Sequence, residues 1–424
     1  MCKNENEFIT TFVQLPGRVP GLLYQPVCAG KKVGLGIVLM HSDSDYLGFV
    51  PAPELAKRGY LVLAADVPEP QKPLDEKLLD VKGAVEYLRR YPGVERVALL
   101  GHSGGATLMS AYQSVAENGA GIFQGPEKII PLDDLADGLS PADGLLLLDS
   151  NFGNGAMTLL SLDPSVTDEG SGQNLDPTLD VFDPANGYDP AGSHYPAEFL
   201  RRFEKAQGER GNRLIDYARA RVQALDAGQG RYADDEPMII PGASQIAPNN
   251  KLFPQDTGLL AHTKGEWPLL HGDGSVSVQQ VPSVRAPRGG RLMTGSLRAG
   301  ALVTTVRTYL KSSAVRTTPE FACGPDGISG IDWASSYCCT PGNVRGVTVP
   351  LLIMGMTGSY EYLAAEVIHQ NAGSADKTLA FVEGAGHNFT PETQCEAYPG
   401  QFGDTVKTLF DYVDRWLEEK LNKE

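Results

Sequence analysis

The sequence predicts an α/β protein: a mostly parallel central sheet with helices on both faces and a large insertion. Short apolar runs alternate with segments of helical periodicity over residues 1–150, and this pattern returns over 346–424. Wholly apolar strands are typical of parallel sheets that are buried on both faces. The stretch 151–345 is rich in Gly, Pro and Asp and breaks the alternation, and a loop of that length without structure would be unusual. We therefore expect one core made of 1–150 and 346–424, with 151–345 inserted as a cap over the site.

The first half of the core begins with a predicted edge hairpin, formed by residues 8–15 and 21–27. Four apolar runs then predict buried strands: 34–40, 60–65, 97–100 and 144–148. Apolar residues at helical spacing predict a helix over 74–91, packed with one face on the sheet. A second helix is expected from the end of the third buried strand to about Tyr112.

The inserted stretch has one clear helical segment, residues 196–226. The core pattern resumes with predicted strands at 347–354 and 378–382. An amphipathic helix over 402–417 is expected to close one side of the sheet.

The charge balance excludes some classes of partner. The 424 residues include 36 Lys and Arg against 52 Asp and Glu, a net charge of −16. Nucleic acids and anionic membranes both require a basic face, so neither is expected as a partner. The chain has no apolar run of membrane-spanning length, and its polar start lacks the apolar core of a signal peptide. These features predict a cytoplasmic protein.

The stretch around which the chain is organised is Gly101-His102-Ser103-Gly104-Gly105, the only match to G-x-S-x-G in the sequence. It follows an apolar strand and precedes small residues that suit a helix start. A sharp turn from strand to helix forces its central residue into a strained conformation, and flanking glycines remove the Cβ atoms that would clash. The pattern predicts that the Ser103 hydroxyl is presented at the sheet edge as a nucleophile, while His102 packs or bonds the backbone.

With this motif and with Gly384-Ala-Gly-His387 after the last predicted strand, the chain resembles the α/β-hydrolase fold family over 1–150 and 346–424. The family often carries a lid or cap at the position of the insertion. The resemblance implies the chain order nucleophile, acid, histidine, with Ser103 as the nucleophile and His387 as the base.

The acid is where the chain departs from the family pattern, because no Asp follows the strand that ends at Met354. Glu361 is the nearest carboxylate and is the preferred acid. Asp149, which follows the preceding strand, is the alternative, since some relatives use that position. Glu383 lies too near His387 in the chain and is expected outside the triad.

An oxyanion hole needs two amide donors. Gly104 is expected to supply one. The other is expected from the turn His41-Ser42-Asp43, where the Asp43 amide is preferred by position and Ser42 is second choice. The Asp43 side chain should point away from a developing oxyanion.

These residues predict a serine hydrolase that cleaves a carboxylic ester through an acyl-enzyme. The same fold also supports acyltransferases, lyases, C–C hydrolases and perhydrolases, and a non-catalytic ligand-binding protein is a further alternative. No cofactor is implied, and without a C-x-x-C pattern no metal site is expected. The large cap indicates a small-molecule substrate, a bulky or partly apolar ester. Aromatic residues of the cap are candidates for an apolar pocket, but most of them are expected to form the cap's own core. The oligomeric state stays open.

Overall fold

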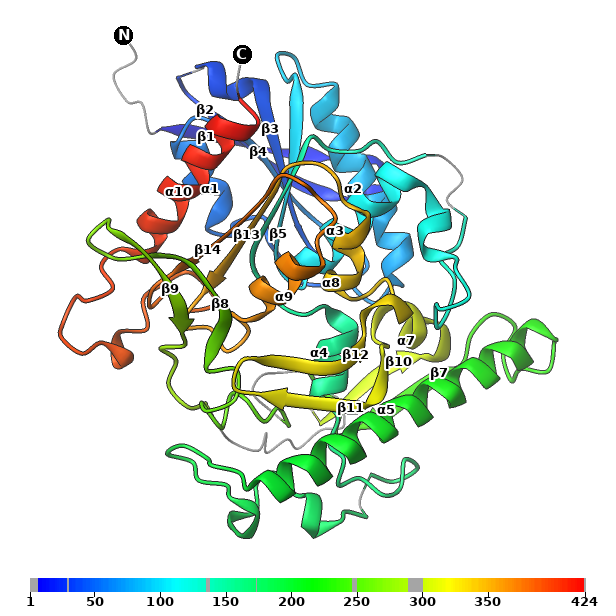
Figure 1. The fold of residues 1–424 in the computed structure, drawn as a ribbon. Helices are drawn as coiled ribbons and strands as arrows, with labels where there is room; N and C mark the ends of the chain where they lie inside the picture. The colour runs from blue at the N-terminus through cyan, green and yellow to red at the C-terminus, as the bar shows by residue number, and fades with distance from the viewer. Residues whose placement is uncertain are drawn as a thin grey trace.

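The computed structural model describes residues 7–28, 30–134, 138–172, 174–245, 250–288 and 300–422. Its centre is a ten-stranded sheet (Figure 1). In spatial order its strands are β1 (Phe8–Gln14), β2 (Pro20–Pro26), β4 (Leu61–Asp66), β3 (Leu35–His41), β5 (Arg96–Ser103), β6 (Gly144–Ser150), β13 (Leu351–Met356), β14 (Lys377–Val382), β8 (His262–Leu270) and β9 (Val276–Pro282). The strands from β4 to β8 are parallel, whereas β1 and β2 at one edge and β9 at the other pair antiparallel.

Helices cover both faces of the sheet, which confirms the predicted fold class. Helices α1 (Pro51–Lys57) and α10 (Thr405–Lys420) pack on one face, and α2 (Leu74–Arg89), α3 (Gly105–Asn118) and α9 (Ala364–Asn371) pack on the other. In β5, Ala98 and Leu100 face the first pair, while Val97 and Leu99 face the second group. Because successive side chains of a strand point to opposite faces, a strand covered on both sides must be apolar throughout.

The inserted region divides between the sheet and a separate layer. Strands β8 and β9 extend the central sheet beyond β14. The remaining inserted elements are α4 (Asn154–Ser161), α5 (Ala197–Asp226), the ribbon β7 (Pro237–Pro241) with β10 (Ala301–Thr305), α7 (Val306–Ser312), the ribbon β11 (Arg316–Gly324) with β12 (Gly327–Asp332), and α8 (Thr340–Asn343). Most of them lie toward the end of the molecule away from both chain termini, whereas α8 packs beside α3 and α9 (Figure 1).

The β8–β9 hairpin therefore differs from the expectation that all of 151–345 stands over the site as a cap. Its pairing with β14 involves only Leu269 and Leu270, the apolar end of β8. The preceding residues, 262–268, are largely polar because they lie at the open end of an edge strand pair. No apolar run was available in the sequence to indicate a strand here.

Aromatic side chains of the insertion belong to its hydrophobic core. Tyr195, Phe199, Phe203 and Tyr337 are buried in the same cluster as side chains of α2, α3 and α9. Tyr188, Trp267 and Trp333 are partly buried against that cluster. The inserted layer and the sheet thus share one continuous apolar interior.

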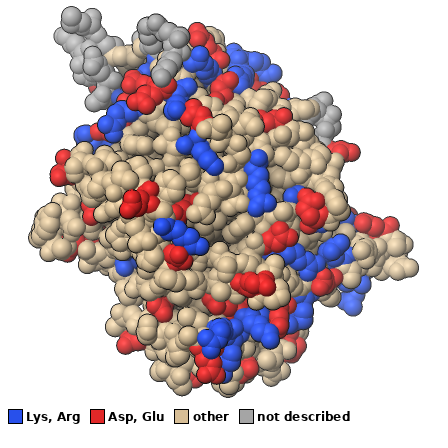
Figure 2. Space-filling view, in the orientation of Figure 1, with Lys and Arg blue, Asp and Glu red and all other residues tan. Residues whose placement is uncertain are grey.

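Among the described residues, no helix combines the length and apolar character needed to cross a bilayer. On the face seen in Figure 2, acidic and basic side chains are interspersed, with no continuous patch of either sign.

Candidate active site

Ser103 ends strand β5 in a left-handed conformation, with φ of 53°. The flanking glycines are required by close packing. A Cβ on Gly101 would lie 2.6 Å from the Ala106 Cα, and one on Gly105 would lie 2.5 Å from the Met40 carbonyl oxygen. Helix α3 begins at Gly105, so unpaired amides and the positive end of the helix dipole lie beside Ser103. A strained, partly exposed serine at a helix N-terminus is the geometry that the sequence predicted.

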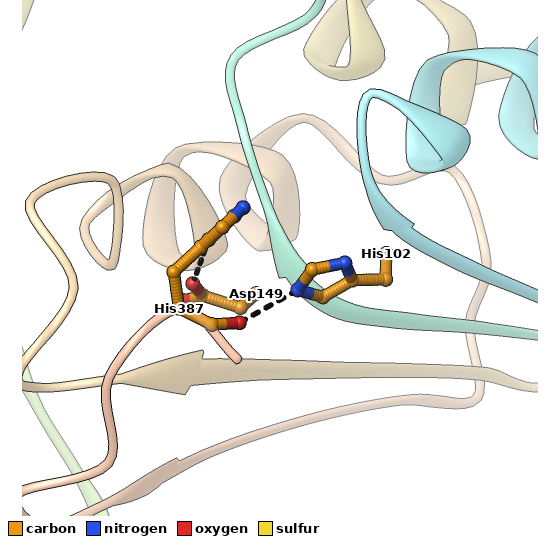
Figure 3. A group of neighbouring side chains, drawn as sticks. All are labelled: His102, Asp149 and His387. Atoms are coloured by element: carbon orange, nitrogen blue, oxygen red, sulfur yellow. Dashed lines mark hydrogen bonds and ion pairs between the residues drawn. The ribbon is translucent and has the colours of Figure 1, made fainter. Parts of the chain in front are cut away.

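His387 lies in the turn after β14, and its ring is held by a carboxylate from a neighbouring strand. Its Nδ1–H donates a hydrogen bond of 2.6 Å to Oδ2 of Asp149 (Figure 3). Asp149 sits near the end of β6 with φ of 42°, beside a shift in the β5–β6 register. Its second oxygen, Oδ1, accepts from the Met356 amide at 3.1 Å. Two strands therefore fix the carboxylate behind the imidazole.

Glu361 does not make the hydrogen bond to His387 that the sequence favoured. Its Oε2 lies 4.0 Å from the Nδ1 of His387 and is buried without a hydrogen-bond partner. The structure brings both candidate carboxylates to the same ring nitrogen but gives the hydrogen bond to Asp149. The positive φ of Asp149, which turns its side chain toward His387, leaves no mark in the sequence.

The electrostatics at His387 favour the charged imidazolium. Burial by itself would lower the pKa of the ring, but the hydrogen bond and charge of Asp149, together with the charge of Glu361, raise the pKa of His387 to about 9.

His102 connects the His387 turn to strand β5. Its Nε2–H donates to the carbonyl oxygen of His387 at 2.8 Å, and the two rings are 4.6 Å apart (Figure 3). The Tyr46 hydroxyl donates to the other ring nitrogen, Nδ1, at 2.6 Å. Burial lowers the pKa of His102 far below its usual range, so this ring is neutral. The residue before Ser103 thus holds the backbone of His387.

Asp43 and Ser42, the two candidates for the second oxyanion donor, lie in the turn after β3, but their order of preference differs from the expectation. The Asp43 amide donates to Nδ1 of His41 at 3.2 Å, and the Ser44 amide donates to the same atom at 3.1 Å. The Asp43 amide is therefore directed at a neighbouring side chain. The Ser42 hydroxyl, by contrast, lies 2.9 Å from the position that a Cβ on Gly104 would occupy. Ser42 is thus the better placed of the two at Gly104.

Comparison with known proteins gives likeness at the level of structure alone. No family model matches the chain, and no curated protein matches its sequence. The esterase Est1E from Butyrivibrio proteoclasticus matches with a TM-score of 0.41 at 12% identity, over 98% of this chain and 99% of that one. The α/β hydrolase GrgF from Penicillium sp. sh18 matches with a TM-score of 0.42 at 12% identity, over 98% and 100%. Carboxyl esterase 2 from Tuber melanosporum matches with a TM-score of 0.40 at 12% identity, over 98% of this chain and 88% of that one.

Three features of this chain identify its fold without the comparisons. They are the strand order, the strained Ser103 turn after β5 and the His387 turn after β14. The chain has an α/β-hydrolase fold. Similarity at 12% identity concerns architecture, so the reactions of the matched proteins are not carried over with it.

Within this α/β-hydrolase fold, two residues near the Ser103 turn could not be recognised in the sequence. The Asn154 side chain, from α4, lies 3.1 Å from the Cβ position of Gly104 and donates to the Ser42 hydroxyl at 3.4 Å. Tyr46 supports His102. Neither residue belongs to a recognisable motif, because each reaches the elbow only through the packing of a distant segment.

His102, Asp149 and His387 form the group with metal-ligand spacing in the described part of the chain. Both nitrogens of His102 and the Nδ1 of His387 are already engaged in the hydrogen bonds described above. The donor set therefore fits a hydrogen-bond network better than a metal centre.

Glu383 lies away from this group and holds a different histidine. Its Oε2 is 2.7 Å from Nδ1 of His271, whose Nε2 is 2.7 Å from the Ser277 hydroxyl. Ser277 lies within the edge strand β9 and does not have a positive φ. This chain of contacts lacks the strained turn and the helix N-terminus found at Ser103.

Proposed function

We propose that this protein is a serine hydrolase that cleaves a carboxylic ester through an acyl-enzyme, with Ser103, His387 and Asp149 as its triad. The observation that carries the proposal is the Asp149–His387 hydrogen bond, made beside a strained serine whose neighbour, His102, binds the His387 backbone. Asp149 replaces Glu361 as the proposed acid because it alone accepts the Nδ1 proton.

In the proposed mechanism, His387 takes the Ser103 hydroxyl proton as the oxygen attacks the ester carbonyl carbon. The resulting oxyanion receives hydrogen bonds from the Gly104 amide and from Ser42. The imidazolium, stabilised by Asp149, then protonates the leaving alcohol and leaves an acyl-Ser103. Water attacks this ester with His387 again as base, which releases the acid and restores the serine.

A pocket of about 490 Å³ lies between the turn after β3 and the inserted layer. It is lined by Asp43, by Asn154, whose side chain lies near Gly104, and by Lys77, Thr305 and Thr308 among others. Polar side chains in its lining alternate with the apolar Pro70, Leu302 and Val303, while aromatic side chains of the insertion pack in the core, as expected for most of them. We infer a small-molecule ester that carries both polar and apolar groups.

The nucleophile is tested by exchanging Ser103 for Ala. We expect kcat with p-nitrophenyl esters to fall by about 10⁴–10⁶-fold, and a fluorophosphonate probe to label the native protein at Ser103 only. Ser277→Ala is the matched control, since Ser277 also contacts a carboxylate-bound histidine, and it should keep both turnover and labelling. Undiminished turnover by the Ser103→Ala protein would end the proposal.

The acid is tested by two amide substitutions. Asp149→Asn removes the acceptor of the Nδ1 proton and should lower kcat by about 10³–10⁴-fold. Glu361→Gln leaves that hydrogen bond in place, so its loss at the pH optimum should be at least about tenfold smaller. The reverse ranking of the two variants, measured as kcat over a full pH range, would return the role to Glu361.

A further inference from the structure

Glu361 is a buried carboxylate that the proposed mechanism leaves unused. It is 4% exposed, in the loop between β13 and α9. Its Oε2 has no hydrogen-bond partner among the described residues and lies 4.0 Å from Nδ1 of His387. The proton on that nitrogen is already given to Asp149. Glu361 can therefore act on the ring only through its charge.

A buried lysine from the inserted region interacts with the same carboxylate through its charge. Lys251 is 1% exposed, and its ammonium donates to the Gln245 carbonyl oxygen at 3.2 Å. Burial lowers the pKa of Lys251 to about 8, and the charge of Glu361 opposes that shift. Burial likewise raises the pKa of Glu361, against the positive charges of His387 and Lys251.

The other groups around His387 are accounted for. Asp149 accepts its proton, and His102 is neutral. Arg288 acts on the ring from the inserted side, but its guanidinium is paired with Glu392 at 2.6 Å. Burial raises the pKa of both neighbouring phenols, Tyr46 and Tyr360, which keeps them uncharged. The Glu361 carboxylate has a hydrogen bond with the Tyr360 hydroxyl, but among the described residues its Oε2, the oxygen near His387, has no hydrogen-bond partner and no lysine or arginine within 4.0 Å.

We propose that Glu361 is a positioning residue that stabilises the His387 imidazolium through space, and that Lys251 of the inserted region adjusts this effect by partly neutralising Glu361. The proposal rests on the proposed role of His387 as base. Charges about 4 Å apart in a poorly solvated site interact strongly, so a second carboxylate can assist the first without touching the ring. The insertion would then influence the reactivity of the core through one buried ammonium.

The test is the ionisation of His387, followed by NMR of its ring in the Ser103→Ala protein, which needs no turnover. The His387 resonance is assigned from its absence in a His387→Gln variant. With Glu361→Gln we expect the pKa of His387 to fall by about one unit, since a negative charge is lost. Glu361→Asp, which keeps the charge on a shorter side chain, should give a smaller fall. Glu383→Gln, a carboxylate four residues from His387 that binds His271, should give none.

The role of Lys251 is tested by a double-mutant cycle. Lys251→Met should shift the His387 ionisation in the native background and leave it unshifted in the Glu361→Gln background. An unchanged pKa of His387 in Glu361→Gln would refute the role of Glu361. A shift of equal size in both backgrounds would refute the coupling through Lys251. Because these readouts are independent of catalysis, a failure of Ser103→Ala to abolish turnover would overturn the proposed function and not this inference.

The Glu361→Gln substitution should also move the acid limb of the pH profile of kcat/KM. Loss of the Glu361 charge makes His387 deprotonate at lower pH, so the Glu361→Gln limb should lie below the native one by the amount that NMR reports. A limb that stays at the native pH while kcat falls would mark a purely structural role for Glu361.

Discussion

At His387, burial and carboxylate charge act in opposite directions, and the carboxylates prevail. The side chain is 32% exposed, yet Asp149 behind it has no exposed surface. A base with a raised pKa is protonated in the resting protein at neutral pH. In the proposed mechanism, it therefore has to lose a proton before it can accept one from Ser103.

Activity and stability should consequently respond to pH in opposite senses. The pKa of His387 is raised from 6.5 to about 9, so its contribution to stability is complete below pH 6.5 and disappears as pH rises through 9. Over the same window kcat/KM should increase as the free base forms. Urea unfolding and steady-state kinetics at matched pH values measure the two trends. His387→Gln should remove this part of the pH dependence of stability, and its persistence in that variant would place the titrating group elsewhere.

The residues of the site differ in how much of them the sequence could predict. The Ser103 turn is local, because its glycines and its strained serine are consecutive. The choice between Asp149 and Glu361 is not local. It depends on a register shift between β5 and β6 and on the positive φ at Asp149, which are set by packing between strands. The hydrogen bond from the Asp43 amide to the His41 ring could not be predicted for a similar reason, because it depends on how the turn after β3 folds.

Among the elements, α5 holds the inserted layer together through one buried arginine. Arg210 is 1% exposed and forms two hydrogen bonds of 2.7 Å with the Glu169 carboxylate. It also donates to the carbonyl oxygens of Asp163 and Pro241, at 2.7 and 2.8 Å. A single side chain thereby joins three segments that have few regular backbone pairings with one another.

Arg210→Met should lower the free energy of unfolding by about 2–3 kcal/mol, because buried carbonyls and a carboxylate lose their donor. The control on the same helix is Lys205→Met, which removes an exposed contact to Glu209 and should cost at most about 0.5 kcal/mol. Chemical denaturation of both variants gives the comparison. Equal losses would show that the Arg210 network adds nothing beyond a surface ion pair.

Element prediction succeeded where burial leaves a strong pattern. The central strands are covered on both faces and are largely apolar along their length. The sequence therefore predicted β3, β4, β5 and β6 close to their observed positions. In β8 the buried residues are Thr263 and the last two, Leu269 and Leu270, and β9 is mostly solvent-exposed. An edge pair of this kind carries too little hydrophobic periodicity to be distinguished from a loop.

At the scale of the whole molecule, the apolar interior does not separate the insertion from the sheet. Phe203 and Ile215 of α5 belong to the same buried cluster as Leu108 of α3 and Ile353 of β13. An inserted layer that shares its core with the sheet has no hydrophobic interior of its own to keep it folded alone.

We therefore expect the chain to unfold in one cooperative transition. The three tryptophans report on different parts, since Trp267 and Trp333 lie in the insertion and Trp416 lies in α10 on the opposite face. Three variants that each retain one tryptophan, with the others changed to Phe, should give coincident fluorescence transitions in urea. An earlier transition at Trp267 or Trp333 would mean that the insertion melts separately.

The position of the β8–β9 hairpin also limits how this protein could be recombined with others. Excising 151–345 as a unit would remove β8 and β9 from beside β14 and leave β14 as a parallel edge strand whose backbone donors and acceptors are open to pairing with another chain. A chimaera that exchanges the inserted layer would have to retain 262–282 and make its cuts on either side of that hairpin. The boundary between the sheet and the separate inserted layer thus runs through the middle of the insertion rather than along its ends.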